Sequence, residues 1–229
     1  MEIDISKPIL DRNERLASEN RALFDANDVF VLDLMASPGA GKTSTILATI
    51  AALRDRYNIA VIEGDIASRV DAEKISAHGI PAVQINTGGA CHLESDMIKR
   101  AINALDLASL DIIIIENVGN LVCPTDFYLG EDAKVMILSI PEGHDKPYKY
   151  PNIFAIAEAV ILNKYDTLSV FDFDEPEFRQ VVHSLNPTAP VFPVSATKGD
   201  GIDAWAQWLI ARIESAKAAR SLSKGSDVS

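Results

Sequence analysis

The stretch ASPGAGKT, residues 36–43, decides the fold of this chain. It follows the apolar run VFVLDLMA (29–36) and precedes STILATIAALRDRY (44–57), whose apolar residues have helical spacing. The order of strand, glycine-rich turn and helix start is that of the phosphate-binding loop GxxxxGK(S/T), with Ala36 in place of its first glycine. A chance glycine turn is the alternative, but it does not explain the lysine, the threonine and this setting together. The pattern therefore predicts a nucleotide-binding P-loop.

The predicted loop offers the nucleotide three kinds of contact. Backbone amides and the positive end of the helix dipole face the phosphates, Lys42 reaches the terminal phosphates, and Thr43 can ligate magnesium. The residues predicted to surround the phosphates are Gly39, Ala40, Gly41, Lys42, Thr43 and Ser44.

Six further apolar runs have the length and composition of buried strands. They lie at residues 58–64, 80–86, 110–117, 133–140, 159–164 and 189–195. Because most of them are separated by stretches of helical periodicity, they predict a doubly wound, largely parallel sheet covered on both faces. We therefore expect an α/β fold with a single P-loop domain over residues 28–215, preceded by an N-terminal helical segment (1–27) and followed by a frayed, flexible tail (216–229).

Composition argues against several classes of protein. The chain has no run of about 18 apolar residues, and its N-terminus lacks the features of a signal peptide. We therefore expect a soluble cytoplasmic protein that does not act on membranes. A formal net charge of −12 argues against a general nucleic-acid binder, which needs a basic surface. Two cysteines cannot form a disulfide framework, so in a reducing compartment we expect them to be buried, catalytic or metal-bound.

A second motif, NKYD at residues 163–166, follows a predicted strand and fits the guanine-binding pattern NKxD. The carboxylate of Asp166 can accept two hydrogen bonds from guanine N1 and N2, whereas adenine offers no such pair. SAT at residues 195–197 fits the loop that closes over the base in GTPases; the three letters recur by chance, but their place after the last strand supports the assignment. The predicted ligand is therefore GTP or GDP. The residues expected around the base are Asn163, Lys164, Asp166, Ser195, Ala196 and Thr197.

Two acidic residues end predicted strands on the nucleotide side of the sheet. Glu116 ends the run IIIIE and begins an ExxG pattern typical of the loop that senses the terminal phosphate, and Asp65 ends VIEGD. We expect Thr43, Asp65 and Glu116 to hold Mg²⁺ or its water, although Asp65 can also serve only as a helix cap. The predicted catalytic residues are Lys42, Asp65 and Glu116. Since no side chain is an obvious strong general base, we expect slow turnover that depends on positioning.

Cys91 and His92 stand side by side in NTGGACHLESD (86–96), and Cys123 follows the strand that ends at Glu116. Because all three lie just beyond predicted strand ends on the nucleotide side, they can converge. Thiolate and imidazole suit Zn²⁺ or Ni²⁺. Spacing alone favours the plainer alternative, in which the cysteines are small core residues and the histidine is a hydrogen-bond donor in a loop. Three ligands do not complete a tetrahedral site, which suggests an open position or a second subunit.

Seven motifs, in order, cover most of residues 30–200: SPGAGKT, EGD, GGACHLE, ENVGNLVCP, GHDKPYKYP, NKYD and SAT. Together they resemble the HypB family of hydrogenase maturation GTPases, which belongs to the SIMIBI class of P-loop proteins. The resemblance implies a GTP-hydrolysing metallochaperone that delivers nickel to the large-subunit precursor of nickel-iron hydrogenase, working with the accessory protein HypA. It also implies that Cys91, His92 and Cys123 bind nickel or zinc at a nucleotide-dependent homodimer interface. By the same resemblance, Lys149 reaches toward the neighbouring subunit's nucleotide.

The sequence departs from some members of that family because it has no N-terminal cysteine cluster and no histidine-rich tract. We therefore expect nickel handling to rest on the interface site and on partner proteins. His78 and His183 are expected to be solvated helix residues, and His144 to be a weaker metal ligand or none.

Two other kinds of protein remain as alternatives. The related urease-maturation GTPase also handles nickel, but it is expected to carry a Cys-Pro-His motif, whereas here Cys91 directly precedes His92 and the pair CP at Cys123 is followed by threonine. The other alternative is a GTP-gated binding module or a small-molecule kinase with structural cysteines. A kinase would transfer phosphate to an added acceptor, whereas a GTPase releases inorganic phosphate without one.

Overall fold

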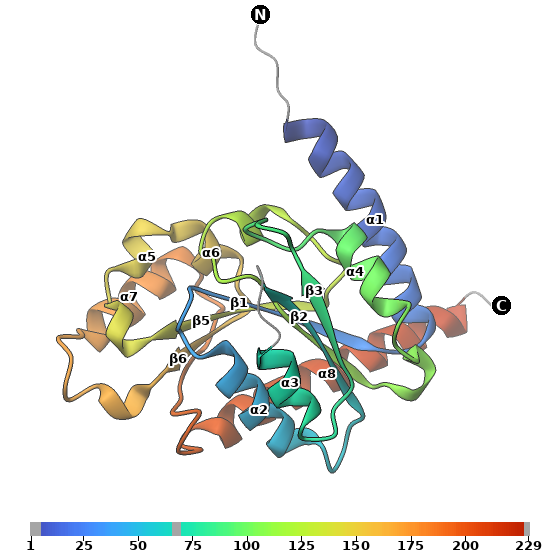
Figure 1. Ribbon diagram of the computed structural model, residues 1–229. Coiled ribbons are helices and arrows are strands. Elements are labelled where there is room, and N and C mark those ends of the chain that lie inside the picture. The colour runs from blue at the N-terminus through green and yellow to red at the C-terminus, as the bar shows by residue number, and fades with distance from the viewer. Residues whose placement is uncertain (1–5, 66–69, 227–229) are drawn as a thin grey trace, which may run out of the picture.

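The computed structural model describes residues 6–65 and 70–226. At its centre is a seven-stranded sheet in the order β3-β2-β4-β1-β5-β6-β7, in which every neighbouring pair of strands is parallel (Figure 1). The strands are β1 (Phe30–Ala36), β2 (Ile59–Asp65), β3 (Ala82–Asn86), β4 (Ile112–Glu116), β5 (Ala133–Ser139), β6 (Ala159–Asn163) and β7 (Val191–Pro193). The prediction of a doubly wound, parallel α/β fold is confirmed.

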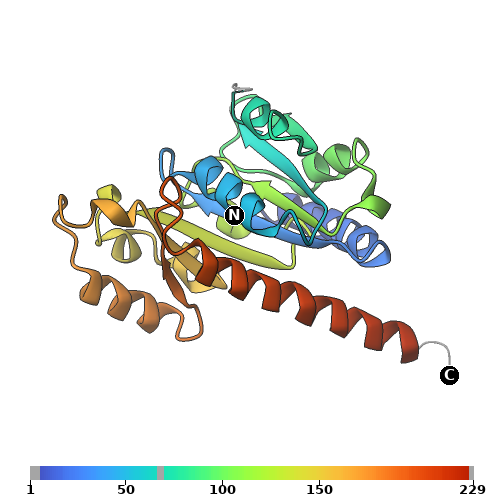
Figure 2. The ribbon, with the colours of Figure 1, turned by 90° about the horizontal axis from the view of Figure 1, so that it is seen from below.

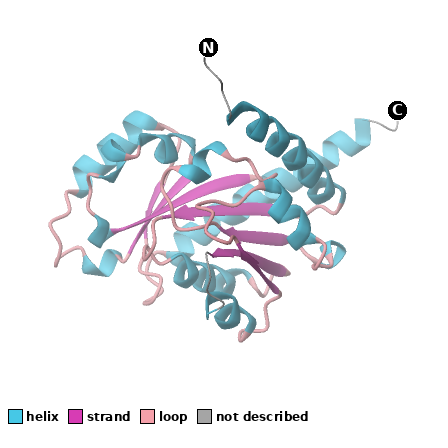
Figure 3. Cartoon of the chain, turned by 45° about the horizontal axis from the view of Figure 1, so that its top comes forward, coloured by secondary structure: helices cyan, strands magenta, loops and turns pink. Residues whose placement is uncertain are grey.

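Helices cover both faces of the sheet, as Figures 2 and 3 show from two further directions. The α-helices are α1 (Ser6–Ala26), α2 (Lys42–Leu53), α3 (Val70–Ser76), α4 (Ser95–Ile102), α5 (Lys146–Lys149), α6 (Pro151–Ile156), α7 (Glu175–Leu185) and α8 (Ile202–Ser226). Short 3-10 helices are η1 (Leu107–Ser109), η2 (Cys123–Asp126), η3 (Ile140–Glu142) and η4 (Tyr165–Thr167). Buried side chains of α2 and α8 pack on one face, and those of α1, α4, α6 and α7 pack on the other.

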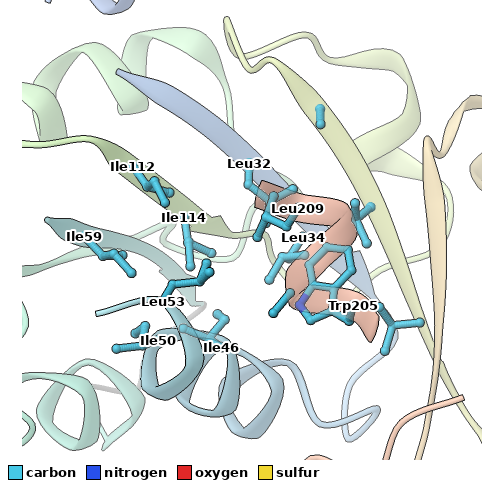
Figure 4. Close-up of a cluster of buried hydrophobic side chains, with 14 of the residues drawn as sticks. Leu32, Leu34, Ile46, Ile50, Leu53, Ile59, Ile112, Ile114, Trp205 and Leu209 are labelled. Atoms are coloured by element: carbon cyan, nitrogen blue, oxygen red, sulfur yellow. The ribbon is translucent and has the colours of Figure 1, made fainter. Parts of the chain in front are cut away.

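The core beneath α2 and α8 fixes the helix that follows the phosphate loop (Figure 4). Ile46 of α2 and Leu34 of β1 belong to this buried cluster, together with Trp205 of α8. The indole Nε1 of Trp205 donates a 2.9 Å hydrogen bond to Thr49 Oγ1, so the one polar atom of this large side chain is paired inside the core. Since α2 begins at Lys42, this packing sets the position of that lysine, which was predicted to contact phosphate, relative to the sheet.

The C-terminal segment differs from the frayed tail that we expected. Residues 216–226 continue α8. Its basic side chains pair with acidic residues of the body: Lys217 Nζ lies 2.8 Å from Asp111 Oδ1, and Arg220 pairs with Asp132. These ion pairs hold residues 216–226 against the body of the domain. The segment was not expected to be a packed helix because its sequence lacks apolar periodicity.

Helix α1 occupies the N-terminal segment in which a helix was expected, while residues 1–5 and 227–229 lie outside the described part of the chain. The buried amide of Asn20 donates to the carbonyls of Ser95 (2.9 Å) and Leu129 (3.2 Å), which ties α1 to the body of the domain. No helix in the described ranges has both the length and the apolar character required to cross a bilayer.

Candidate functional site

The phosphate loop is the turn between β1 and α2 (Figure 1). Gly39 and Gly41 both have positive φ angles, 79° and 96°, which favour glycine. At Gly41, the residue that precedes α2, a Cβ atom would also overlap the Nδ2 atom of Asn163. The predicted loop residues, with Ser44 in the first turn of α2, thus form a helix N-terminus of the kind that binds anions.

The guanine motif contacts this loop directly. Asn163 Nδ2 donates to the carbonyl of Ala40 at 2.9 Å, and Lys164 Nζ donates to the carbonyl of Gly39 at 2.7 Å. Lys164 itself adopts a left-handed conformation (φ 55°), which turns its side chain out of β6. The spacing between the base-binding and phosphate-binding motifs is therefore fixed by side chain to backbone hydrogen bonds.

Asp166 lies at the outer end of this motif and is ionised. Its carboxylate accepts a hydrogen bond from Ser195 Oγ (2.8 Å) and lies 3.2 Å from Lys198 Nζ, and these two contacts hold the pKa of Asp166 below its ordinary value. The amide of Ala196 donates to Asn163 Oδ1 at 3.2 Å, while Thr197 is exposed in the same loop. The structure therefore brings the SAT loop next to NKYD, as the sequence analysis expected.

On the opposite side of the phosphate loop lies a cavity of about 270 Å³. It is lined by Pro38, Gly39, Lys42, Glu63, Gly64, Asp65, Glu116, Val118 and Gly119. The three predicted catalytic residues thus share one cavity. Thr43 Oγ1 lies within hydrogen-bond distance of both carboxylate oxygens of Glu116, at 3.1 and 3.3 Å, so a hydroxyl and a carboxylate suited to Mg²⁺ stand together.

Glu63, a buried carboxyl group that lines this cavity, was not among the predicted site residues. Glu63 lies directly beside Glu116 in the register of β2 and β4. The sequence did contain a signal for Glu63. Side chains two residues apart on a strand lie on the same face, and Asp65, two residues after Glu63, was already predicted to lie on the nucleotide side, where the structure has this cavity.

The loop after β4 lies against the phosphate loop. At Gly119 a Cβ atom would come within 2.9 Å of the Pro38 side chain, and the amide of Asn120 donates to the carbonyl of Ala36 at 2.9 Å. The side chain of Asn120 then accepts hydrogen bonds from the amides of Val122 (2.8 Å) and Cys123 (3.4 Å). The loop after β4 thus connects the cavity to Cys123 in one continuous, hydrogen-bonded segment.

Cys91, His92 and Cys123 converge, with one possible ligand atom from each lying within 4.8 Å of the others. Cys91 Sγ lies 2.7 Å from Cys123 Sγ and 3.6 Å from His92 Nδ1. All three residues are partly buried, and they form the one such cluster of three or more potential ligands in the described parts of the chain. Two sulfurs and one imidazole nitrogen form a donor set that suits Ni²⁺ or Zn²⁺, but they leave coordination positions to be filled.

The surroundings of the cluster favour a neutral imidazole at His92 and a protonated thiol at Cys123 in the metal-free protein. Burial lowers the pKa of His92, whose ring stacks on Phe127 with centroids 3.8 Å apart. The hydrogen bond with Cys91, followed by burial, raises the pKa of the Cys123 thiol. Metal binding to this cluster must therefore displace a proton from the Cys123 sulfur.

The remaining histidines and Lys149 lie apart from this cluster. His144 Nδ1 accepts a hydrogen bond from the Asp174 amide at 3.2 Å, so this side chain is engaged beside α7. His78 and His183 are exposed on or next to helices, as expected. Lys149 is an exposed residue of α5 that pairs with Asp145.

Comparisons with known proteins agree with this geometry. A family model described as the CobW/HypB/UreG nucleotide-binding domain matches residues 30–193. The hydrogenase maturation factor HypB of Escherichia coli K12 is 47% identical over 207 residues, which cover 90% of this chain and 71% of that protein.

Two solved structures resemble the whole domain. The crystal structure of HypB from Helicobacter pylori in complex with nickel is 38% identical, with a TM-score of 0.85 over 89% of this chain and 96% of that one. HypB from Archaeoglobus fulgidus is 32% identical, with a TM-score of 0.83 over 89% of this chain and 99% of that one. The chain therefore belongs to the HypB family of hydrogenase maturation factors, among the nucleotide-binding proteins of the CobW/HypB/UreG group.

Proposed function

We propose that this protein is a cytoplasmic, GTP-hydrolysing nickel chaperone that supplies the large-subunit precursor of a nickel-iron hydrogenase. The observation that carries the proposal is the continuity of residues 116–123. Glu116 lines the nucleotide cavity, and Cys123, seven residues later, belongs to the thiol and imidazole cluster. A change at the terminal phosphate therefore has a short path to a metal ligand.

On the nucleotide side, each group has a defined task. Lys42 neutralises the terminal phosphates, while the Thr43 hydroxyl and the carboxylates of Asp65 and Glu116 hold Mg²⁺. Bound Mg²⁺ would supply positive charge to the phosphate oxygens. GTP hydrolysis is slow in this arrangement because the cavity offers positioning and charge rather than a strong base.

On the base side, the ionised Asp166 selects guanine. Its oxygens accept hydrogen bonds from guanine N1 and N2, and each oxygen has more than one acceptor position, so Ser195 and Lys198 can remain in contact. The serine and lysine contacts also hold the carboxylate in place before the nucleotide arrives.

On the metal side, Cys91, His92 and Cys123 bind Ni²⁺ as cargo, with Zn²⁺ as the competing ion. The incomplete donor set supports a GTP-dependent homodimer in which a second copy completes the coordination. Exposed apolar side chains support this assembly: Val122, next to Cys123, is 56% exposed, and Tyr148, next to Lys149, is 59% exposed. Lys149 then approaches the nucleotide of the neighbouring subunit, and a HypA-like nickel protein and the hydrogenase precursor are the further partners.

The coupling test measures nickel and zinc binding by the purified protein with a non-hydrolysable GTP analogue and with GDP, while molecular mass is recorded. Wild type is expected to dimerise with the GTP analogue and to bind nickel with different affinities in the two nucleotide states, since a ligand shifts an equilibrium only through differential affinity. Cys91→Ala and His92→Ala are expected to lose this binding, and His183→Ala serves as the exposed histidine control. Equal nickel affinity in both states would reject the coupling.

Phosphate release separates a GTPase from a kinase. Inorganic phosphate is expected to appear from GTP without any added acceptor and to depend on Mg²⁺. Release that requires an acceptor would instead favour the kinase alternative.

A further inference from the structure

A buried charged cluster that the proposed mechanism does not use lies beneath the two metal-binding segments. These are the segment that carries Cys91 and His92 and the segment that begins at Cys123. Asp33 of β1 is fully buried, and it stands opposite Lys134 of β5 in the strand register. Lys134 Nζ lies 3.1 Å from Asp33 Oδ2 and 3.2 Å from Glu131 Oε1. Removing charges from water is costly unless each one is paired and hydrogen-bonded, so the remaining partners of these groups are informative.

The remaining hydrogen bonds of Lys134 go to the segment behind Cys123. Its ammonium donates to the carbonyl of Phe127 at 2.9 Å and to that of Pro124 at 3.4 Å. Phe127 also forms the stacking surface of the His92 ring. The Lys134 ammonium, on a partly buried side chain, thus fixes the backbone next to one ligand and the aromatic ring that supports another.

Asn117 connects the same cluster to the other metal-binding segment. Its Nδ2 donates to Asp33 Oδ1 at 3.0 Å, and its Oδ1 accepts hydrogen bonds from the amides of Val118 (2.9 Å) and Leu93 (3.3 Å). Leu93 directly follows His92 in the sequence. Asn117 itself directly follows Glu116, which lines the nucleotide cavity.

We propose that Asp33, Asn117 and Lys134 are positioning residues for the metal site. They hold the segment after Cys91 and His92 and the segment after Cys123 at a fixed separation, and they transmit movement of Glu116 to both. This inference rests on the proposed metal-binding function and adds to it the residues that set the geometry. None of the three belongs to the cluster of candidate metal ligands or to the lining of the nucleotide cavity.

The pattern of contacts distinguishes this role from that of an ordinary buried ion pair. Strands β1 and β5 already pair through their backbones, so hydrogen bonds from this ion pair to other segments are not needed to hold the sheet together. Here the spare donors and acceptors reach Pro124, Phe127 and Leu93, all of which lie in the two metal-binding segments. Outer partners that orient metal-binding groups commonly change metal affinity by about 10- to 100-fold when they are removed.

The test uses two variants that disturb the cluster in different ways. Asn117→Ala exchanges one neutral side chain for another and leaves the ion pair in place. The double variant Asp33→Asn with Lys134→Met removes one charge of each sign, and Met retains the apolar stem. Glu131 loses its cation in this variant but keeps the hydrogen bond from the Leu129 amide. Lys217→Met is the matched control, because Lys217 also pairs with an aspartate, Asp111, but has no contact with the metal-binding segments among its described bonds.

Nickel(II) is titrated against a competing chelator with the GTP analogue and with GDP, and the thiolate-to-nickel absorption is recorded. Affinity for the GTP analogue is measured separately, and circular dichroism checks folding. Both cluster variants are expected to bind nickel about 10- to 100-fold more weakly and to lose most of the difference between nucleotide states, with GTP-analogue affinity within about twofold of wild type. Lys217→Met is expected to behave as wild type.

The inference is overturned if Asn117→Ala, folded and binding the GTP analogue, keeps both the nickel affinity and the nucleotide dependence of wild type. If the double variant does not fold, Asn117→Ala decides the question alone. A failure of the proposed function itself has a different signature: nickel binding by wild type would then be absent, or unchanged in Cys91→Ala.

Discussion

The guanine side and the metal side of the site are joined to the phosphate loop by different means. On the guanine side, Asn163 and Lys164 donate directly to carbonyls of the loop, so base and phosphate positions are set by single hydrogen bonds. On the metal side, Cys123 is linked to the loop through Asn120, whose amide donates to the carbonyl of Ala36 and whose side chain accepts a hydrogen bond from the Cys123 amide. The first arrangement is suited to constant recognition of the nucleotide, and the second leaves room for a movement that depends on its state.

Lys42→Ala tests the phosphate loop, which the guanine side and the metal side share, and it should have the largest effect on GTP hydrolysis. Removing one preorganised cation from the phosphates is expected to lower GTP hydrolysis about 100- to 1,000-fold. Phosphate release measures this loss, with Lys217→Ala, at an ion pair outside the cavity, as the control. Nickel binding without nucleotide should persist, and unchanged GTP affinity would show that the phosphate loop does not bind the nucleotide.

Asp166→Asn changes the guanine side of the site and leaves the metal side intact. The loss of a charged acceptor is expected to weaken GTP binding about 10- to 100-fold, since hydrogen bonds to charged groups contribute about 1.5–3 kcal/mol. Xanthosine triphosphate, which carries a carbonyl where guanine has its 2-amino group, should recover affinity because the new amide can donate to it. Asp172→Asn, an exposed change in the following loop, is the control. If Asp166→Asn and Asp172→Asn each bound GTP and xanthosine triphosphate with equal affinity, Asp166 would have no part in base recognition.

Gly41→Ala and Gly39→Ala compare two positions within the phosphate loop, of which only Gly41 would place an added methyl group against the guanine motif. Both alanines would sit at positive φ, a conformation that costs an L-residue about 1–2 kcal/mol. At Gly41 the added methyl group also meets Asn163, whereas nothing lies within 4 Å of a Cβ at Gly39. We expect Gly41→Ala to lower the free energy of unfolding by about 1–3 kcal/mol more than Gly39→Ala, in line with the effect of overpacking. Urea denaturation compares the two, and equal losses would mean that Asn163 moves away freely.

The smallest expected effect concerns the pH dependence of metal-free stability. Burial lowers the pKa of His92 from its ordinary value of 6.5, so below that pH the unfolded chain binds more protons than the folded one. This contribution to stability is therefore present above about pH 6.5 and is lost as the pH falls through the window below it. The free energy of unfolding should decline more steeply between about pH 7.5 and about pH 5 in wild type than in His92→Gln. The exposed His183→Gln should follow wild type, and parallel curves for wild type and His92→Gln would contradict the assignment.

Much of the nucleotide site could be predicted because its signals are local. The phosphate loop and NKYD each carry their chemistry within a few consecutive residues, and the strand that precedes each is a continuous apolar run. The structure places Lys42, Asp65 and Glu116 in one cavity as the strand order implies. The convergence of Cys91 with Cys123 was also expected, since both follow strands whose ends meet on one side of the sheet.

The supporting residues could not be predicted because their partners are set by strand order. Asp33 stands in an otherwise apolar strand, and nothing in the sequence shows that β5 brings Lys134 beside it. The helical tail was missed for a similar reason, since the acidic partner of Arg220 is Asp132, which lies 88 positions away in the chain.

The position of β3 has a mechanical consequence for metal binding. In the described part of the chain this strand forms one edge of the sheet and pairs only with β2, whereas β4 lies between β2 and β1 in the interior. Since Cys91 and His92 follow β3 and Cys123 follows β4, an ion bound by all three would join the edge of the sheet to its interior. Loading with nickel should therefore slow amide hydrogen exchange along β3.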